Sequence, residues 1–296
     1  MNHRFGFAVN LMLGDERLYM KGIKLASIQK KGLEKVAEIY RENINTTLTI
    51  LKYCKNSGIR FYRIGDLFPF NTHPILAHYN YFDDFDQELY ELGQYIKIHD
   101  IRISVHSSPY CILSSDNPEI VKKSILELTR HAALLRKLEV PSNNRIVVHV
   151  GSSVGGKEKS SKRFVDVCNN LPTNVKNAIA LENDDKQYSI SDVLDISNKC
   201  SIPVILDIFH HSLHNPEKID IIRAMELATA TWKDGPAEIH YSCQEEGKIK
   251  GSHSDTVNAQ DLLTFVTSVN NLSYDIMLEV KDTHQSVEKF LRILQK

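Results

Sequence analysis

Short apolar runs rich in Val, Ile and Leu alternate with longer stretches of helical periodicity along the whole chain. The runs show little alternation of apolar and polar positions, which is typical of strands buried on both faces of a parallel sheet. The runs occupy residues 5–10, 60–65, 101–106, 145–150, 178–183, 203–208, 237–242 and 275–280. Helical patterns follow them, most clearly at 30–57, 83–98, 117–138 and 159–170. This alternation predicts an α/β fold, a (β/α)8 TIM barrel, rather than an open sheet.

Nothing in the sequence divides this pattern into separate units. There is no linker, low-complexity tract or Pro/Gly-rich seam, so we expect residues 1–296 to form a single TIM-barrel domain. The chain is 42% hydrophobic and 25% charged, which is ordinary for a globular protein. No apolar run approaches the roughly 18 residues of a membrane-spanning helix, and the start lacks a signal-peptide cleavage site. Five scattered Cys without CxxC spacing fit reduced thiols in a cytoplasmic protein.

The charge balance argues against a broadly basic nucleic-acid-binding protein, because 36 basic and 37 acidic residues leave a net charge of −1. Two lysine-rich clusters stand out, one within residues 21–35 and one within residues 157–163. A solvated helix face is the usual place for such charges. Both clusters follow predicted strands, however, so a barrel would place them on the rim where TIM-barrel active sites lie.

Six of the apolar runs carry, at or near their carboxyl ends, a residue type that binds metal ions. These residues are His106, His149, Glu182, Asp207, His240 and Glu279. Imidazole and carboxylate are the ligands of catalytic zinc and manganese sites, and a TIM barrel gathers the carboxyl ends of its strands at one mouth. A single His is more often a surface or core residue, but this joint placement predicts one polynuclear metal site at the mouth.

The order of the strands divides these ligands into two groups. The first group comprises His106, His149 and Glu182, and the second comprises Asp207, His240 and Glu279. Glu182 can bridge the two groups, and a carboxylate shared by two ions about 3.5–4 Å apart suits in-line attack on phosphate esters. His210 and His253, which we expect in loops beyond the strand ends, are candidates for a third ion.

The segment 151–157 superficially has the form G-x-x-x-x-G-K of a phosphate-binding loop and follows a predicted strand. Glu158 stands where that motif requires Ser or Thr for magnesium, so the sequence does not favour a nucleotide-binding loop. A flexible glycine hinge that carries Lys157 to the rim is the better interpretation. The sequence contains no nucleophile elbow and no G-x-G-x-x-G fingerprint.

Six stretches carry the most specific pattern in the chain. They are GIRFYRIGDLFPF (58–70), HVGSSVGGKEKSSKRF (149–164), ALENDD (180–185), ILDIFHH (205–211), IHYSCQ (239–244) and MLEVK (277–281). Together they resemble the UV damage endonucleases, which are metal-dependent DNA repair enzymes, and the resemblance covers nearly the whole chain. It implies a TIM barrel similar to apurinic endonuclease IV and the xylose isomerases, with divalent ions, typically manganese, in its mouth.

The resemblance also implies an activity. The family incises the phosphodiester immediately 5′ to a UV photoproduct, such as a cyclobutane pyrimidine dimer or a 6-4 photoproduct, and leaves a 3′-hydroxyl and a 5′-phosphate. We therefore expect damaged double-stranded DNA as the partner, sharply bent and with the damaged dinucleotide flipped out. Weakened stacking at the lesion lowers the cost of that extrusion. We expect a monomer that does not bind membranes.

Matching positions imply roles for individual residues. One ion would be held by His106, His149 and Glu182, a second by Glu182, Asp207, His240 and Glu279, and a third with help from His210 and His253. We expect two to three ions per chain, Mn²⁺ by resemblance, with Zn²⁺, Co²⁺ or Mg²⁺ as alternatives. These ligands, with Glu238 nearby, would form the catalytic set, in which a metal-bound hydroxide attacks the scissile phosphorus.

A second set of positions is expected to contact DNA. His73 matches a position that can contact phosphate, and Asn10 and Tyr110 match residues around the damaged site and the opposite bases. Lys157 and Lys159 belong to this set as the cations of the predicted rim, and Phe7 and Pro109 belong to it as expected contacts to the lesion.

Three positions depart from the family pattern. Phe7 replaces a tyrosine that the family commonly has near the lesion, and Pro109 replaces a glutamine, so its side chain can wedge but not donate a hydrogen bond. Glu238 stands where the family often has a lysine that can be carboxylated, which keeps a negative charge on a shorter arm. We expect incision to survive with altered efficiency, and Phe7→Tyr with Pro109→Gln to raise it.

Three other interpretations remain open at this stage. An endonuclease acting mainly at abasic sites would share the fold and the metal site. A sugar isomerase or epimerase uses the same barrel and metals, but it would be indifferent to DNA. A DNA-binding module without catalysis would show no metal-dependent turnover. A shared fold does not by itself decide among these functions.

Overall fold

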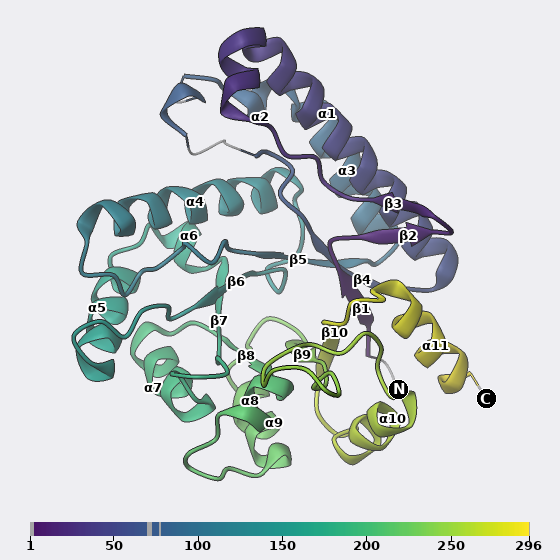
Figure 1. Cartoon of the computed structure of the whole chain (residues 1–296), viewed down its shortest axis with the longest axis vertical. Helices are drawn as coiled ribbons and strands as arrows, with labels where there is room; N and C mark the ends of the chain where they lie inside the picture. The colour runs from purple at the N-terminus through teal and green to yellow at the C-terminus, as the bar shows by residue number, and fades with distance from the viewer. Residues whose placement is uncertain (1–2, 70–72, 77, 296) are drawn as a thin grey trace.

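The structure is a computed structural model that describes residues 3–69, 73–76 and 78–295. Eight parallel strands close into a barrel in the order β1-β10-β9-β8-β7-β6-β5-β4 (Figure 1), which confirms the predicted (β/α)8 TIM barrel. The strands are β1 Phe5–Ala8, β4 Phe61–Ile64, β5 Arg102–His106, β6 Ile146–His149, β7 Ile179–Glu182, β8 Val204–Asp207, β9 Ala237–Tyr241 and β10 Tyr274–Leu278. All eight predicted strands are present.

Helices surround this barrel (Figure 1). They are α1 Leu25–Ser57, η1 Pro74–Leu76, α2 Tyr81–Asp84, α3 Asp86–Ile98, α4 Pro118–Lys137, α5 Lys157–Asn169, α6 Thr173–Lys176, α7 Ile190–Cys200, α8 Ile208–Leu213, α9 Ile221–Thr229, α10 Ala259–Ser268 and α11 His284–Leu294. The four clearest helical patterns correspond to α1, α3, α4 and α5. A kink divides α1 at Gly32, whose φ of 68° suits a residue without Cβ. In the described part of the chain, no helix has the length and apolar character needed to cross a membrane.

The segment between the first strand and α1 is not a plain loop. It contains an antiparallel hairpin of β2 (Leu11–Leu13) and β3 (Glu16–Leu18). Gly14 and Asp15 form the two-residue turn, and Gly14 has a φ of 62° that its missing Cβ permits. Leu11 is fully buried, so the hairpin packs against the core. This hairpin forms part of the loop face that follows the carboxyl ends of the strands.

The two faces of the barrel wall have different chemistry. Outward side chains of β1 pack against α11, where the ring of Phe5 meets that of Phe290 at 4.9 Å. The inward side is partly ionic, because Arg102 of β5 donates to Asp275 of β10 at 3.0 Å. Arg102 also donates to the Asn143 carbonyl at 2.8 Å. These buried contacts close the amino-terminal end of the barrel and leave the opposite end to the site residues.

Candidate metal centre at the barrel mouth

Three predicted ligands converge where β5, β6 and β7 end. The parallel register places His149 beside Glu182 on neighbouring strands. The Nε2 atom of His106 lies 3.4 Å from Glu182 Oε2, and the Nε2 atom of His149 lies 3.2 Å from the same oxygen. One donor atom from each residue falls within 4.8 Å of the others. The side chains are thus close enough to bind one cation together.

A second group shares Glu182. One donor atom each from Glu182, Asp207 and His240 also lies within 4.8 Å of the others, and all three residues are buried. His240 Nδ1 is 2.7 Å from Glu182 Oε1 and 3.3 Å from Glu279 Oε1. The three residues of the second predicted group therefore lie together, and Glu182 lies between the two groups. Glu279 reaches this group through its contact with His240.

Backbone carbonyls orient three of the histidines. The Nδ1 atoms of His106, His210 and His253 lie 2.7, 3.0 and 2.7 Å from the carbonyl oxygens of Ser107, Asn183 and Glu279, respectively. A carbonyl oxygen can only accept, so each Nδ1 carries a proton and each Nε2 is the nitrogen left to bind a cation. This arrangement is the usual second contact of a metal-binding histidine.

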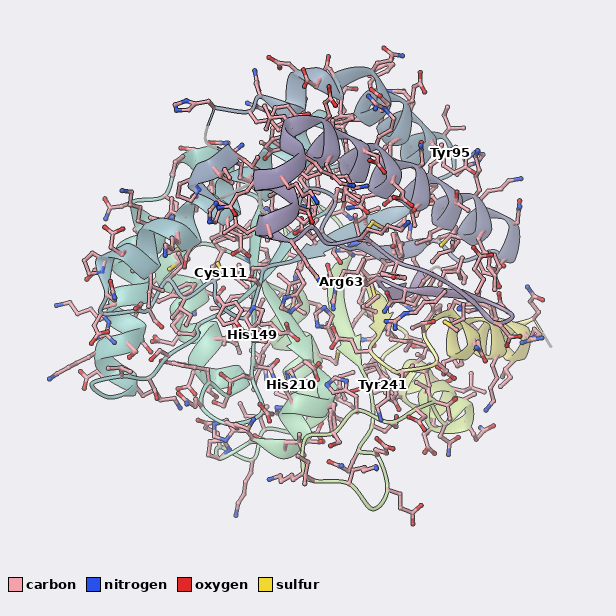
Figure 2. All side chains as sticks on the ribbon, turned by 45° about the horizontal axis from the view of Figure 1, so that its top comes forward. Arg63, Tyr95, Cys111, His149, His210 and Tyr241 are labelled. Carbon is pink, nitrogen blue, oxygen red and sulfur yellow. The ribbon has the colours of Figure 1, made fainter. Side chains whose placement is uncertain are left out.

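His210 lies in a helix and not in a loop, so the prediction of a loop position was wrong. It belongs to α8, which starts directly after β8, and the side chain of Asp207 caps this helix by accepting the His210 backbone N–H at 2.7 Å. The helical turn brings the His210 ring to 6.2 Å from that of His149 and 6.1 Å from that of His253. Figure 2 shows His149 and His210 on adjoining parts of the barrel. The candidate third group is thereby contiguous with the first.

Arg63 is the main site residue that the sequence analysis did not single out. It projects from β4 to contact Glu279 and lies 2.6 Å from His240 Nε2. Its guanidinium is 3.6 Å from Glu238, a fully buried carboxylate that also lies 3.1 Å from His240 Nε2. A charged residue within an otherwise apolar strand was the available signal, since alternate strand positions face the barrel interior.

The pKa values of the site carboxylates depend on burial and on nearby positive charge. Burial opposes ionisation of Glu182, but the imidazoles of His240 and His149 outweigh it and hold the pKa of Glu182 well below its ordinary value. Burial likewise acts on Glu279, yet the Arg63 guanidinium keeps its pKa at about 2. Burial raises the pKa of Asp207 to about 6. Protonated imidazole or a bound divalent cation can supply the charge that these carboxylates require.

A further observation supports the binding of a divalent cation by this donor set. Among the described residues, several buried polar atoms of this cluster take part in no hydrogen bond. They are His149 Nδ1, Glu182 Oε2, Asp207 Oδ2 and Glu238 Oε2. Buried carboxylate oxygens without partners are costly, and two of these belong to residues of the compact donor groups. Imidazole and carboxylate together are the donors that Zn²⁺ and Mn²⁺ take.

The predicted DNA-contacting residues lie in different loops of the structure. Pro109 and Tyr110 lie in the loop after β5, and Tyr110 is 82% exposed. Asn10 is half-buried at the rim, just beyond Val9, whose φ of 61° is rare for a β-branched residue. The Val9 N–H donates to the Arg63 carbonyl at 3.0 Å, which holds this turn in place. His73 lies beside η1, where its Nδ1 accepts the Ile75 N–H at 3.2 Å.

Phe7 is not available to DNA in this structure, which corrects the expectation of a lesion contact. Its side chain is fully buried, with ring centroids 5.3 Å from Tyr62 and 5.8 Å from His284 of α11. Phe7 therefore packs on the outer side of the barrel wall. The position does not face the mouth, because successive strand side chains alternate between the two faces.

Lys157 begins α5 after a glycine-rich turn, and its ammonium group is directed to the neighbouring helix. Its Nζ lies 2.5 Å from Asp192 of α7 and 5.8 Å from the centre of the Tyr188 ring. Gly155 and Gly156 have φ of 79° and 99°, so the turn uses conformations that favour glycine. Lys159 lines the same groove between α5 and α7.

A cavity of about 420 Å³ opens beside the metal-ligand cluster. Its lining includes Arg63 and His106 of the cluster and Asp66, Glu127 and His131 from the surrounding segments. Its volume is within the range of about 300–1,000 Å³ that is usual for ligand pockets.

Comparisons with known proteins give the family. The model of the family UV-endonuclease UvdE matches residues 3–296. A "UV DNA damage endonuclease" of Clostridium perfringens (strain 13 / Type A) is 32% identical over 267 residues, which cover 89% of this chain and 65% of that protein. Another of the same name, from Halalkalibacterium halodurans, is 32% identical over 84% of this chain and 79% of its own length.

Solved structures agree with the sequence match. The structure titled "Crystal Structure of SacUVDE" superposes with a TM-score of 0.90 at 38% identity, covering 99% of this chain and 98% of that one. A D-psicose 3-epimerase from Clostridium cellulolyticum H10 superposes with a TM-score of 0.53 at 16% identity, over 78% of each chain. That second likeness shows the barrel fold alone. The chain therefore belongs to the UvdE family of UV endonucleases, enzymes that act on DNA, as the family match and the likeness to SacUVDE show and the strand-end histidines and carboxylates support.

Proposed function

We propose that this chain is a divalent-metal-dependent endonuclease that incises damaged duplex DNA immediately 5′ to a UV photoproduct and leaves a 3′-hydroxyl and a 5′-phosphate. The observation that carries the proposal is the sharing of Glu182 by two donor groups within one barrel mouth. Two adjacent cations bridged by a carboxylate are the arrangement that stabilises both the attacking and the leaving oxygen of a phosphate ester. The names of the curated relatives support the choice of damaged DNA.

We propose Mn²⁺ as the ion, with two to three ions per chain. His106 and His149 would hold the first with Glu182, and Asp207, His240 and Glu279 would hold the second with the same carboxylate. His210 and His253 would present their Nε2 atoms to a third. When bound, such ions supply positive charge to the phosphoryl oxygens and activate water as the nucleophile.

Residues around these ligands keep the donors in place. Arg63 lies against both Glu279 and His240, so it holds two donors of the second group in place and offsets the negative charge of Glu279. Glu238 lies beneath His240 at 3.1 Å and takes part in orienting its ring. We assign Glu238 this positioning role rather than direct binding of an ion.

Substrate contact would come from the rim. Tyr110 is exposed at the tip of the loop after β5, where its ring can stack on bases that the lesion has already loosened. The cavity beside His106 could receive an extruded base next to the ligand cluster. Asn10 and His73 would contact the strand from the loops after β1 and β4. Lys159 would contribute a phosphate contact from the start of α5.

An end-labelled duplex with a single cyclobutane pyrimidine dimer tests the proposal. It is incubated with the protein and Mn²⁺, beside an undamaged duplex, an abasic duplex, an EDTA control and a Glu182→Gln variant. We expect one cut immediately 5′ to the dimer, lost in EDTA and in the variant. A cut at the abasic duplex alone would instead indicate an abasic endonuclease. No metal-dependent cut in any duplex would overturn nuclease function.

A further inference from the structure

Two apolar side chains at the barrel mouth are exposed to an unusual degree. Ile249, in the loop after β9, is 83% exposed, and Tyr110, in the loop after β5, is 82% exposed. They are the most exposed large apolar side chains in the described part of the chain, ahead of Ile98 at 74%. Single exposed apolar residues are ordinary, so their position on the fold decides whether they matter.

The two residues lie on opposite sides of the candidate metal centre. In the closed strand order, β5 and β9 are separated by three strands in either direction, so their loops lie across the mouth from one another. In Figure 2, Cys111, which follows Tyr110 in the sequence, and Tyr241, which ends β9, lie to either side of His149 and His210. A duplex laid across the mouth would meet one exposed apolar tip on each side.

The loop that carries Ile249 is held by its own hydrogen bonds. Gln244 donates to the Ile249 carbonyl at 3.0 Å and accepts the Gly251 N–H at 2.9 Å. The Ser252 N–H closes a turn on the Ile249 carbonyl at 3.1 Å. A bridge between Gln244 and His253 joins the two ends of the loop. The tip is therefore connected through a short ordered segment to a candidate metal ligand.

The charges around the tip suit contact with phosphates. Lys248 and Lys250 flank Ile249, and both are exposed. Of the three acidic residues in the loop after β9, Glu245 and Asp255 pair with Lys281. Glu246 is left to oppose the two flanking lysines. An apolar side chain flanked by two lysines can insert between stacked base pairs while the lysines contact the DNA phosphates.

We propose that Ile249 is a second apolar wedge, which inserts into the DNA duplex on the side of the lesion opposite to Tyr110. This inference rests on the proposed function and adds to it a contact from the β9 loop. Apolar side chains inserted between base steps unstack and kink the duplex, and the kink allows more of the DNA to contact the protein. Two wedges across one mouth hold the scissile phosphate over the ligand cluster between them.

The test compares Ile249→Ser with Ile249→Leu and with Ile98→Ser. Ile98 is the matched control because it is also highly exposed but ends α3, just before β5, at the opposite end of the barrel. Binding in Ca²⁺ of lesion and undamaged duplexes of one sequence is followed by fluorescence anisotropy. A 2-aminopurine placed opposite the lesion, one step away, reports unstacking. Melting temperatures verify that each variant is folded.

We expect Ile249→Ser to weaken binding of the lesion duplex about tenfold, since burial of one aliphatic side chain is lost, and to reduce the 2-aminopurine signal. Ile249→Leu and Ile98→Ser should behave as wild type. If wild type prefers the lesion duplex and Ile249→Ser binds and unstacks it equally well, the wedge is refuted while the proposed function stands. If wild type shows no preference for the lesion, both proposals fall.

Discussion

Glu238 is a fully buried carboxylate that lies among cations rather than among metal ligands alone. It is within 4 Å of both Arg63 and Arg102 and 3.1 Å from His240. The arginines and His240 hold its pKa below the ordinary value even though burial acts in the opposite direction. Its negative charge is therefore part of the balance that allows two guanidinium groups to be buried.

Glu238→Lys, which places a cation at this position, should destabilise the protein. An ammonium group beside Arg63 and Arg102 would leave three cations in a buried space, and breaking a buried ion pair costs about 3–5 kcal/mol. Glu238→Gln is the matched variant, because it keeps the shape and an acceptor for His240. The free energy of unfolding, from urea titrations in EDTA, should fall more for Lys than for Gln. Values for both variants equal to that of wild type would show that the charge has no such role.

Pro109 precedes the exposed Tyr110 and can offer neither an amide side chain nor a backbone N–H. Pro109→Gln should increase kcat/KM for incision of a dimer-containing duplex several-fold, because about 1 kcal/mol from one new hydrogen bond is worth that much. Pro109→Ala removes the ring without adding the amide and should bring no gain. Equal activities of the two variants would exclude a role for the amide. Since Phe7 is buried against α11, Phe7→Tyr is no longer expected to help.

The strands and their terminal residues were predictable from the sequence, because apolar runs with His, Asp or Glu at or near their ends indicate both the barrel and the ligand site at its mouth. The hairpin of β2 and β3 was missed although Gly14-Asp15 is a recognised two-residue turn. The segment α8 has only six residues, too few for helical periodicity to show, so His210 was assigned to a loop. The inward ionic residues Arg63 and Arg102 stand out as charges within apolar strands, but only a fold identifies their partners.

Gly93 of α3 illustrates a packing constraint that sequence periodicity does not reveal. A Cβ at this position would lie 2.1 Å from the backbone oxygen of Leu138, the C-cap residue of α4. Gly93→Ala should therefore lower the free energy of unfolding by about 1–3 kcal/mol through overpacking. Helix propensity alone would instead favour Ala by up to about 1 kcal/mol. Gly22→Ala, where nothing lies within 4 Å, is the control. Stabilisation by Gly93→Ala in denaturant titrations would contradict the close approach.

The ligand cluster also contributes to the stability of the whole molecule, because it draws residues from six strands or strand ends into one buried site. A cation at a hundred times its Kd adds about 2.7 kcal/mol, or roughly 5–10 °C in Tm at about 2–4 °C per kcal/mol. Calorimetry should show that increase between EDTA and Mn²⁺ for wild type. Glu182→Gln, which removes the shared negative charge, should show little of it. The same Tm for wild type in both solutions would mean that no ion is bound with useful affinity.

Association of the whole molecule with DNA has to rely on local charge, since the net charge is only −1. Lys159, near the start of α5, lies towards the mouth, whereas Lys199 ends α7 at the opposite end of the barrel and pairs with Asp195 at 2.5 Å. Lys159→Ala should reduce the slope of log K against log salt by about 0.9, the value for one phosphate contact. Lys199→Ala should leave the slope unchanged. Anisotropy titrations between 50 and 200 mM salt resolve the difference. Over this range, the affinity of a protein that makes about 6–10 phosphate contacts changes a thousandfold or more. Identical slopes for wild type and Lys159→Ala would remove α5 from the DNA-contacting face.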